Sequence, residues 1–163
     1  MEKAALKEHR RHSTADKPFS YYISNIPEYF PNAPMHWHKE FELNVILEGE
    51  GDFVTGDIHF TAYKGDIVLT PPDMLHAVYQ HDDKRCVYDT LDLDGSMLGS
   101  RDNGRAADAF IAPLISGAYS IETHITPEHC YYSELLTTAE NMISAAKGDT
   151  PLLDMLIKSE LLL

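Results

Sequence analysis

The sequence has few cysteines, no long apolar run and a shortage of basic residues, and each shortage excludes a class of protein. Its 163 residues include two cysteines, Cys86 and Cys130, with no CxxC pair. Such sparse thiols are typical of a reducing compartment, so each cysteine is predicted to be a small core residue and no disulfide is expected. No apolar run is long enough to span a bilayer, and the charged amino terminus lacks the apolar centre of a secretory signal. A cytoplasmic protein is therefore predicted.

The few basic residues are also unevenly distributed along the chain. Lys and Arg number 13 against 26 Asp and Glu, which gives a formal net charge of −13. A phosphate backbone repels such a chain, so nucleic-acid binding by this segment is not expected. The first positions are the exception, with Lys3, Lys7, Arg10, Arg11 and Lys17. This arm, residues 1–18, is expected to be solvated and partly helical or disordered; the alternative is that it folds back onto the acidic body.

Residues 19–94 consist of short β-prone runs separated by turn signals. The runs include Phe41–Leu47, Asp52–Thr55, Ile58–Ala62, Asp66–Thr70, Ala77–His81 and Arg85–Leu93. Gly56-Asp57 suits a two-residue hairpin, and Asp82-Asp83 suits another turn. Many short strands at close spacing favour an antiparallel sandwich or barrel over a parallel sheet. We predict a mainly β domain over residues 19–125.

Towards the carboxy terminus the pattern becomes helical. A short helix is predicted over 105–116 and a strand over Ala118–His124. Thr126 and Pro127 are predicted to begin a helix that ends at Gly148, because its apolar positions recur every three or four residues. These positions are Leu135, Leu136, Ala139, Met142, Ile143 and Ala146.

A second helix is predicted after Thr150-Pro151, which would cap it. It carries Leu152, Leu153, Leu156, Ile157 and Leu161. The chain then stops in the apolar run LIKSELLL, so we expect it to be a piece of a longer protein. The helical segment, residues 126–163, suggests a homodimer through an apolar face that includes Leu136, Met142, Leu153 and Leu156.

The stretch HWHKEFELNVILEG places two histidines and a glutamate in a predicted strand. His36, His38 and Glu42 share a face if the segment stays extended or bends once near Lys39-Glu40. His76 follows the next long strand. Imidazole and carboxylate are the usual ligands of zinc, iron, manganese, nickel and copper. The set predicts an open divalent-metal site; the alternatives are a metal-free polar pocket for a sugar or small acid, and histidines with structural bonds only.

Alternation along the same strand makes a second prediction. Its odd residues are apolar, whereas its even residues are mostly polar; the odd set is Phe41, Leu43, Val45 and Leu47. If Glu42 faces the interior, something must cover the odd face. We predict that the two carboxy-terminal helices, or a partner subunit, pack there.

Other residues are weaker candidates for a ligand pocket. They are Asn44, Trp37 and Tyr88, with His59, Tyr63 and Asp92 as further possible polar contacts. Trp37 has odd parity and is interpreted more readily as a packing aromatic than as a stacking platform for a sugar. His9, His12, His124 and His129 are taken as ordinary.

The spacing of these residues resembles the two-part signature of the cupin superfamily. The residues that match are His36, His38, Glu42 and Gly49 in the first part, and Gly65, Pro71 and His76 in the second. The sequence departs from the signature at Phe30, Asp73 and Gln80. The four ligand positions are thus intact, while the turn chemistry is altered.

More narrowly, the run from His36 to Val78 resembles the amino-terminal sensor domain of AraC-type bacterial transcription regulators, and the resemblance spans about residues 20–163. It implies a cupin-type jelly-roll barrel that binds a small effector, such as a sugar or related metabolite, followed by two helices that join barrels into dimers. DNA would be bound only by a helix-turn-helix domain beyond residue 163.

The resemblance also implies that His36, His38, Glu42 and His76 line the effector pocket. It leaves open whether they hold a divalent metal (Zn, Ni, Mn or Fe) or contact an organic effector directly. A sensor rather than an enzyme is expected; the alternative is a metal-dependent cupin dioxygenase, isomerase or lyase.

Overall fold

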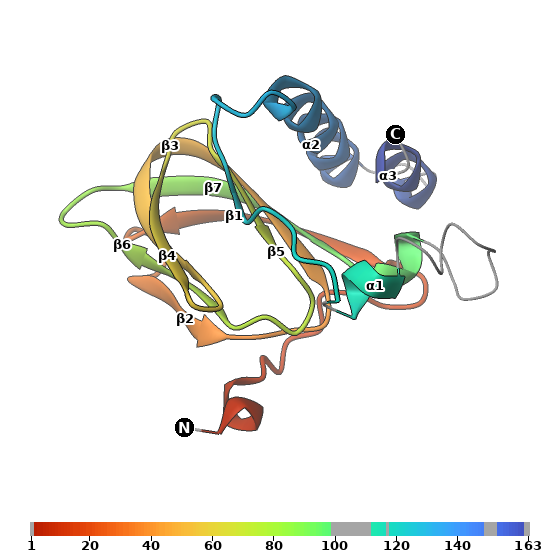
Figure 1. Ribbon diagram of the computed structural model, residues 1–163, viewed down its shortest axis with the longest axis horizontal. Coiled ribbons are helices and arrows are strands. Elements are labelled where there is room, and N and C mark those ends of the chain that lie inside the picture. The colour runs from red at the N-terminus through yellow and green to blue at the C-terminus, as the bar shows by residue number, and fades with distance from the viewer. Residues whose placement is uncertain (1, 99–111, 117, 149–152, 162–163) are drawn as a thin grey trace.

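A computed structural model of the chain describes residues 2–98, 112–116, 118–148 and 153–161 (Figure 1). The strands are β1 (Phe19–Ile26), β2 (Asn32–His36), β3 (Phe41–Thr55), β4 (Ile58–Tyr63), β5 (Ile67–Thr70), β6 (His76–Gln80), β7 (Cys86–Leu93) and β8 (His124–Ile125). The helices are α1 (Ala112–Ile115), α2 (Tyr132–Lys147) and α3 (Leu153–Leu161), with 3-10 turns η1 (Lys3–Leu6) and η2 (Gly95–Leu98). No helix in these described ranges is long and apolar enough to cross a membrane.

The strands form an antiparallel barrel whose two sides share β3. On one side the order is β1-β7-β3-β5-β8, and on the other β3 pairs with β4 and β6, and β6 with β2. Every pairing between these strands is antiparallel. Figure 1 looks into the barrel and shows α2 and α3 outside it. The predicted fold, a mainly β barrel followed by carboxy-terminal helices, is confirmed.

Strand β3 passes from one side of the barrel to the other, although the sequence predicts two separate runs there. Its register against β7 shifts between Ile46 and Glu48. Gly49 follows at φ +71°, and a Cβ at this glycine would overlap the carbonyl oxygen of Arg85. A left-handed residue lets the strand bend without ending, so the run 41–47 and the run 52–55 are one strand.

The outer face of β3 is covered by the carboxy-terminal helices, as predicted. Leu43 and Val45 belong to one buried cluster with residues of α2 and α3, and Phe41 and Leu47 pack against it. The helical members of the cluster are Ala139, Met142, Ile143, Ala146 and Ile157. This packing buries the odd face of β3 and leaves its even face free to line the barrel interior.

Several predicted boundaries near the helices are wrong. Helix α2 begins at Tyr132 and not at Thr126, because the carbonyl of Thr126 accepts from the amide of His129 in a turn before the helix. Its end at Gly148 is confirmed. The strand predicted over 118–124 is reduced to β8, since the amides of residues 118 and 119 bond to the carbonyl of Pro113 and close α1.

Other predictions have mixed outcomes. The turns at Gly56-Asp57 and Asp82-Asp83 are confirmed. Cys86 and Cys130 are free as predicted, but Cys130 is exposed rather than a core residue. The helix predicted over 105–116 is seen only as α1, and residues 105–111 and the cap at 150–151 lie outside the described residues.

Candidate metal and effector site

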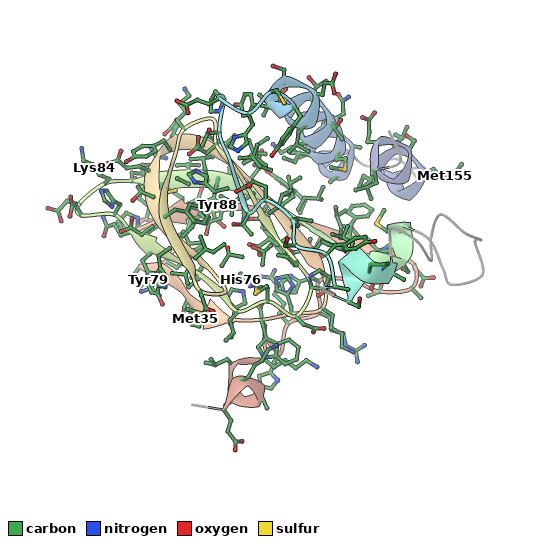
Figure 2. The ribbon with its side chains drawn as sticks, viewed as in Figure 1. Met35, His76, Tyr79, Lys84, Tyr88 and Met155 are labelled. Carbon is green, nitrogen blue, oxygen red and sulfur yellow. The ribbon has the colours of Figure 1, made fainter. Side chains whose placement is uncertain are left out.

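The structure brings His36, His38, Glu42 and His76 together inside the barrel. His36 ends β2 and lies opposite His76, the first residue of β6. The chain then bends at Lys39-Glu40, as predicted, and Glu42 follows near the start of β3. One ligand atom from each of the four residues lies within 4.8 Å of the others. Figure 2 shows His76 inside the barrel.

Backbone hydrogen bonds orient two of the three imidazoles. His36 Nδ1 lies 2.7 Å from the carbonyl oxygen of Pro34, and His76 Nδ1 lies 2.9 Å from that of Met74. A carbonyl accepts, so each Nδ1 carries the proton and donates it. In a neutral ring the lone pair is then on Nε2, which is the arrangement found in most metal-binding histidines.

The distances between donor atoms fit a shared ion better than direct hydrogen bonds. Glu42 Oε2 lies 3.4 Å from His38 Nε2 and 3.5 Å from His76 Nε2. Hydrogen bonds between such groups are usually shorter, whereas two ligands bound at about 2.1 Å to one tetrahedral ion are about 3.4 Å apart. His76 Nε2 is also buried without a hydrogen-bond partner. The donor set therefore fits a divalent transition metal.

A second buried carboxylate adds to the demand for a cation. Asp92 on β7 is the cross-strand partner of Glu42 on β3. Asp92 is 1% exposed, and its Oδ1 has no hydrogen-bond partner. Like charges directly opposite on neighbouring strands are destabilising, so nearby positive charge is needed. Part of it comes from His12, whose Nδ1 lies 2.7 Å from Asp92 Oδ2.

The pKa values in the cluster follow from this crowding. Burial alone would raise the pKa of Glu42, but His76 and His38 outweigh it and hold that pKa well below its usual value. The pKa of His76 is raised, since Glu42 outweighs the effect of burial. Burial and the neighbouring His76 lower the pKa of His36. A metal ion would thus replace the proton that Glu42 favours on His76.

A cavity of about 530 Å³ adjoins three of the four residues, His36, Glu42 and His76. It is lined by the arm residues Glu8, Arg10 and His12, by Tyr22, Ser24, Asn32, Tyr88 and Thr90 from the strands, and by His36, Glu42 and His76, with apolar side chains such as Phe30 and Val78. The volume is in the range of small-molecule sites. Both polar and apolar groups line this cavity next to the candidate ligands.

Residues 17–162 match the family model of the AraC-like ligand binding domain. The chain belongs to this family. Over 89 residues, this AraC-like ligand binding domain is 27% identical to the uncharacterized HTH-type transcriptional regulator YdeC of Bacillus subtilis. The match covers 54% of this chain and 31% of that protein, so the chain spans about a third of its relative.

Solved structures similar to the AraC-like ligand binding domain include cupins. A cupin protein from Bacteroides fragilis is 19% identical, with a TM-score of 0.44, over 56% of this chain and 76% of that chain. An oxalate decarboxylase from Bacillus subtilis is 20% identical, with a TM-score of 0.42, over 48% of this chain and 22% of that chain.

The other predicted pocket residues of the AraC-like ligand binding domain differ in their placement. Tyr88 lines the cavity (Figure 2), and burial together with Glu42 raises its pKa. Asn44 points inward but supports Glu42, because its Nδ2 donates to Glu42 Oε1 at 2.7 Å. Trp37 is outside the cavity lining; its odd parity turns the indole toward the arm, where Nε1 donates to the carbonyl of Lys3. His59 and Tyr63 are exposed on β4.

Most side chains of the arm of the AraC-like ligand binding domain are exposed, and the arm contains the 3-10 turn η1, but it also contacts the barrel. His12, taken as ordinary in the sequence, is 6% exposed. Burial lowers its pKa, but bonds to Asp92 and Glu8 outweigh this effect and raise the pKa to about 11. The contrast between the basic arm and the acidic body is the only sequence signal for this contact, and it does not single out His12.

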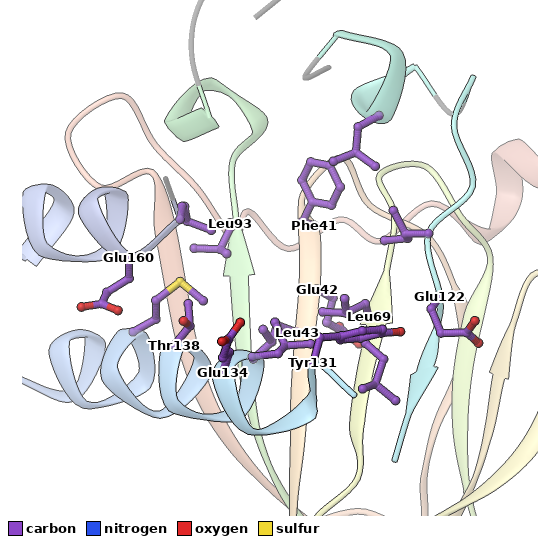
Figure 3. A pocket seen from close by; sticks show the side chains of 16 residues that line it. Phe41, Glu42, Leu43, Leu69, Leu93, Glu122, Tyr131, Glu134, Thr138 and Glu160 are labelled. Carbon is purple, nitrogen blue, oxygen red and sulfur yellow. The ribbon is translucent and has the colours of Figure 1, made fainter. Parts of the chain in front are cut away.

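A second cavity of about 600 Å³ lies between the barrel and the helices (Figure 3). It is lined by Phe41, Leu43, Leu69, Leu93, Leu135 and Met142, with Tyr131, Glu134, Thr138 and Glu160 among the polar residues. Glu42, one of the candidate ligands, is also among its lining residues. This cavity therefore adjoins the histidine cluster at Glu42.

Proposed function

We propose that this chain is the effector-sensing domain of an AraC-type transcriptional regulator, with a pocket built around a divalent metal ion. The observation that carries the proposal is the placement of four potential ligands close together beside a cavity of about 530 Å³. Membership of the AraC-like ligand binding family and the similarity to an HTH-type regulator support it. DNA would be bound by a helix-turn-helix domain outside this chain, in the cytoplasm.

The effector is a small polar molecule, a sugar or a related metabolite. The lining supports this class, since it combines hydroxyl, amide and aromatic groups from Ser24, Thr90, Asn32 and Tyr22. Such groups recognise hydroxyl-rich ligands by hydrogen bonds and by packing on ring faces. His36, His38, Glu42 and His76 would hold Zn, Ni, Mn or Fe, and the ion would supply a Lewis-acidic contact for an effector oxygen.

Effector binding is expected to stabilise the folded chain. A screen of sugars and small organic acids, each with and without Zn²⁺ or Mn²⁺, should find a compound that raises the melting temperature. At one hundred times its Kd, a ligand stabilises by about 2.7 kcal/mol, which corresponds to roughly 5–10 °C for a domain of this size. The measurement is a thermal-shift assay, and a Tyr88→Phe variant, which loses one hydroxyl from the pocket, should show a smaller shift.

The same donor set would also serve a metal-dependent cupin enzyme, and the screen separates the two functions. Incubation of the stabilising compound with metal-loaded protein should return it unchanged by NMR if the domain is a sensor. Conversion to product that is lost in the Glu42→Gln variant would support the dioxygenase, isomerase or lyase alternative instead. No stabilising compound in a broad screen would count against a polar effector.

We propose that the domain is a homodimer joined through its carboxy-terminal helices. Leu136 and Met142, predicted for the interface, instead pack into the chain's own core, so the contact must use other residues. Met155 and Leu156 on α3 are 64% and 47% exposed, and Figure 2 shows Met155 on α3, outside the barrel. Leu156→Glu is expected to convert dimer to monomer in light scattering at micromolar concentration. A monomer in the unaltered chain would contradict the proposal.

A further inference from the structure

The arm is fixed beside the segment that carries the candidate ligands. The amide of Glu8 donates to the carbonyl of Trp37 at 3.0 Å, and the amide of Trp37 donates to the carbonyl of Leu6 at 3.1 Å. These bonds form a parallel bridge between Lys7 and Trp37. Because Trp37 lies between His36 and His38, the bridge places Glu8 next to both imidazoles.

The carboxylate of Glu8 points toward the cluster. Its Oε2 accepts from His12 Nε2 at 2.9 Å and lies 3.4 Å from His36 Nε2. The second distance equals the spacing between Glu42 and His38, which is too long for a typical hydrogen bond and matches two ligands of one ion. Glu8, His12 and His38 also form a potential ligand group of their own, with atoms within 4.8 Å.

Glu8 can bind an ion without losing its existing contact. A carboxylate has about four lone-pair sites, so Oε2 can keep the bond to His12 while it approaches a cation near His36 Nε2. A buried carboxylate next to His38 also favours a cation in the cluster, because Asp92 Oδ1 lies 3.9 Å from His38 Nε2 and has no hydrogen-bond partner. Asp92 and His38 are 1% and 4% exposed.

We propose that Glu8 is a further ligand of the cation held by His36, His38, Glu42 and His76, so that the ion fastens the amino-terminal arm to the barrel. The inference rests on the metal ion in the proposed function and adds to it the arm's part in the coordination. Ion binding and arm docking are therefore linked. If docking of the arm through Glu8 raises the affinity for the ion by some factor, ion binding raises the equilibrium constant for arm docking by the same factor.

Glu8→Gln is the variant that tests this link. It keeps the size and the acceptor oxygen of the side chain but removes the charge, so we expect its affinity for Zn²⁺ or Ni²⁺ to fall about 10-fold or more. The second readout is trypsin cleavage of the arm, where Lys7, Arg10 and Arg11 are exposed. In the unaltered chain, Zn²⁺ should slow this cleavage by a similar factor; in Glu8→Gln the ion should give little protection. Calorimetry and timed proteolysis measure the two effects.

Glu2→Gln is the matched control, since Glu2 is an exposed glutamate of the same arm and its side chain makes no capping bond. It should bind the ion and be protected like the unaltered chain. Two results would overturn this inference and leave the barrel site intact. One is unchanged ion affinity in a folded Glu8→Gln protein; the other is that Glu8→Gln speeds cleavage of the arm, relative to the unaltered chain, by the same factor with and without Zn²⁺. No ion binding by the unaltered chain would instead remove the metal from the proposed function, and this inference with it.

Discussion

His38→Ala is expected to lower the affinity of the chain for Zn²⁺ or Ni²⁺ by about 100-fold or more, the upper end of what loss of a partner around a metal ligand costs. His38 is a candidate ligand that lies near both buried carboxylates, with Nε2 3.4 Å from Glu42 Oε2 and 3.9 Å from Asp92 Oδ1. Its removal takes away a nitrogen ligand and leaves the donor set incomplete. Calorimetry, with elemental analysis of protein purified without a histidine tag, measures the change.

The control for this variant is His59→Ala, because His59 is an exposed histidine on β4 and is not part of the cluster. It should bind the ion as the unaltered chain does. The metal site would be refuted if the unaltered protein were empty and also failed to take up added zinc, nickel or manganese. Equal affinity in His38→Ala and His59→Ala would likewise exclude His38 as a ligand.

Gly49→Ala is expected to lower the free energy of unfolding by about 2–4 kcal/mol, more than Gly65→Ala. Alanine at φ +71° is strained by about 1–2 kcal/mol, and its Cβ would overlap the Arg85 carbonyl, which is backbone and cannot rotate away. The melting temperature should fall by roughly 10 °C. Urea unfolding followed by circular dichroism measures the change.

Gly65→Ala separates strain from steric overlap. Gly65 also has a positive φ, +95°, but the nearest atom to an added Cβ is the Tyr132 hydroxyl at 3.4 Å. Only the backbone strain applies there, so a loss of about 1–2 kcal/mol is expected. If Gly49→Ala were no more destabilising than Gly65→Ala, the bend in β3 would not depend on the close approach of Arg85.

Local alternation was sufficient to predict much of the candidate site. The two-residue period, together with the predicted bend near Lys39-Glu40, indicated that His36, His38 and Glu42 come together; in the structure His36 ends β2, the chain bends, and Glu42 lies in β3. The same period required a cover on the odd face, and the helices supply it. His76 comes from a separate strand, and its place beside His36 was predicted by the spacing of the cupin-like signature.

Features that depend on tertiary contacts were not predicted. The arm is fixed by a backbone bridge between residues 30 positions apart, Lys7 and Trp37, and such a bridge leaves no periodic pattern. The sequence therefore gives no indication that His12 is buried beside Asp92. Thr126-Pro127 has the residue types that often begin a helix, but in the structure these residues form a turn, and the helix begins at Tyr132. Gly49 matches a sequence motif, but the motif does not reveal its physical role, which is to bend β3 against Arg85.

The two faces of β3 serve different neighbours at adjacent positions. Glu42 faces the histidine cluster, while Leu43 belongs to the buried cluster that includes Met142 of α2. One peptide unit joins these two residues, and it cannot stretch. A ligand that displaces the Glu42 backbone also displaces the Leu43 backbone. A movement inside the barrel is therefore passed to a residue that packs against α2 through one peptide bond.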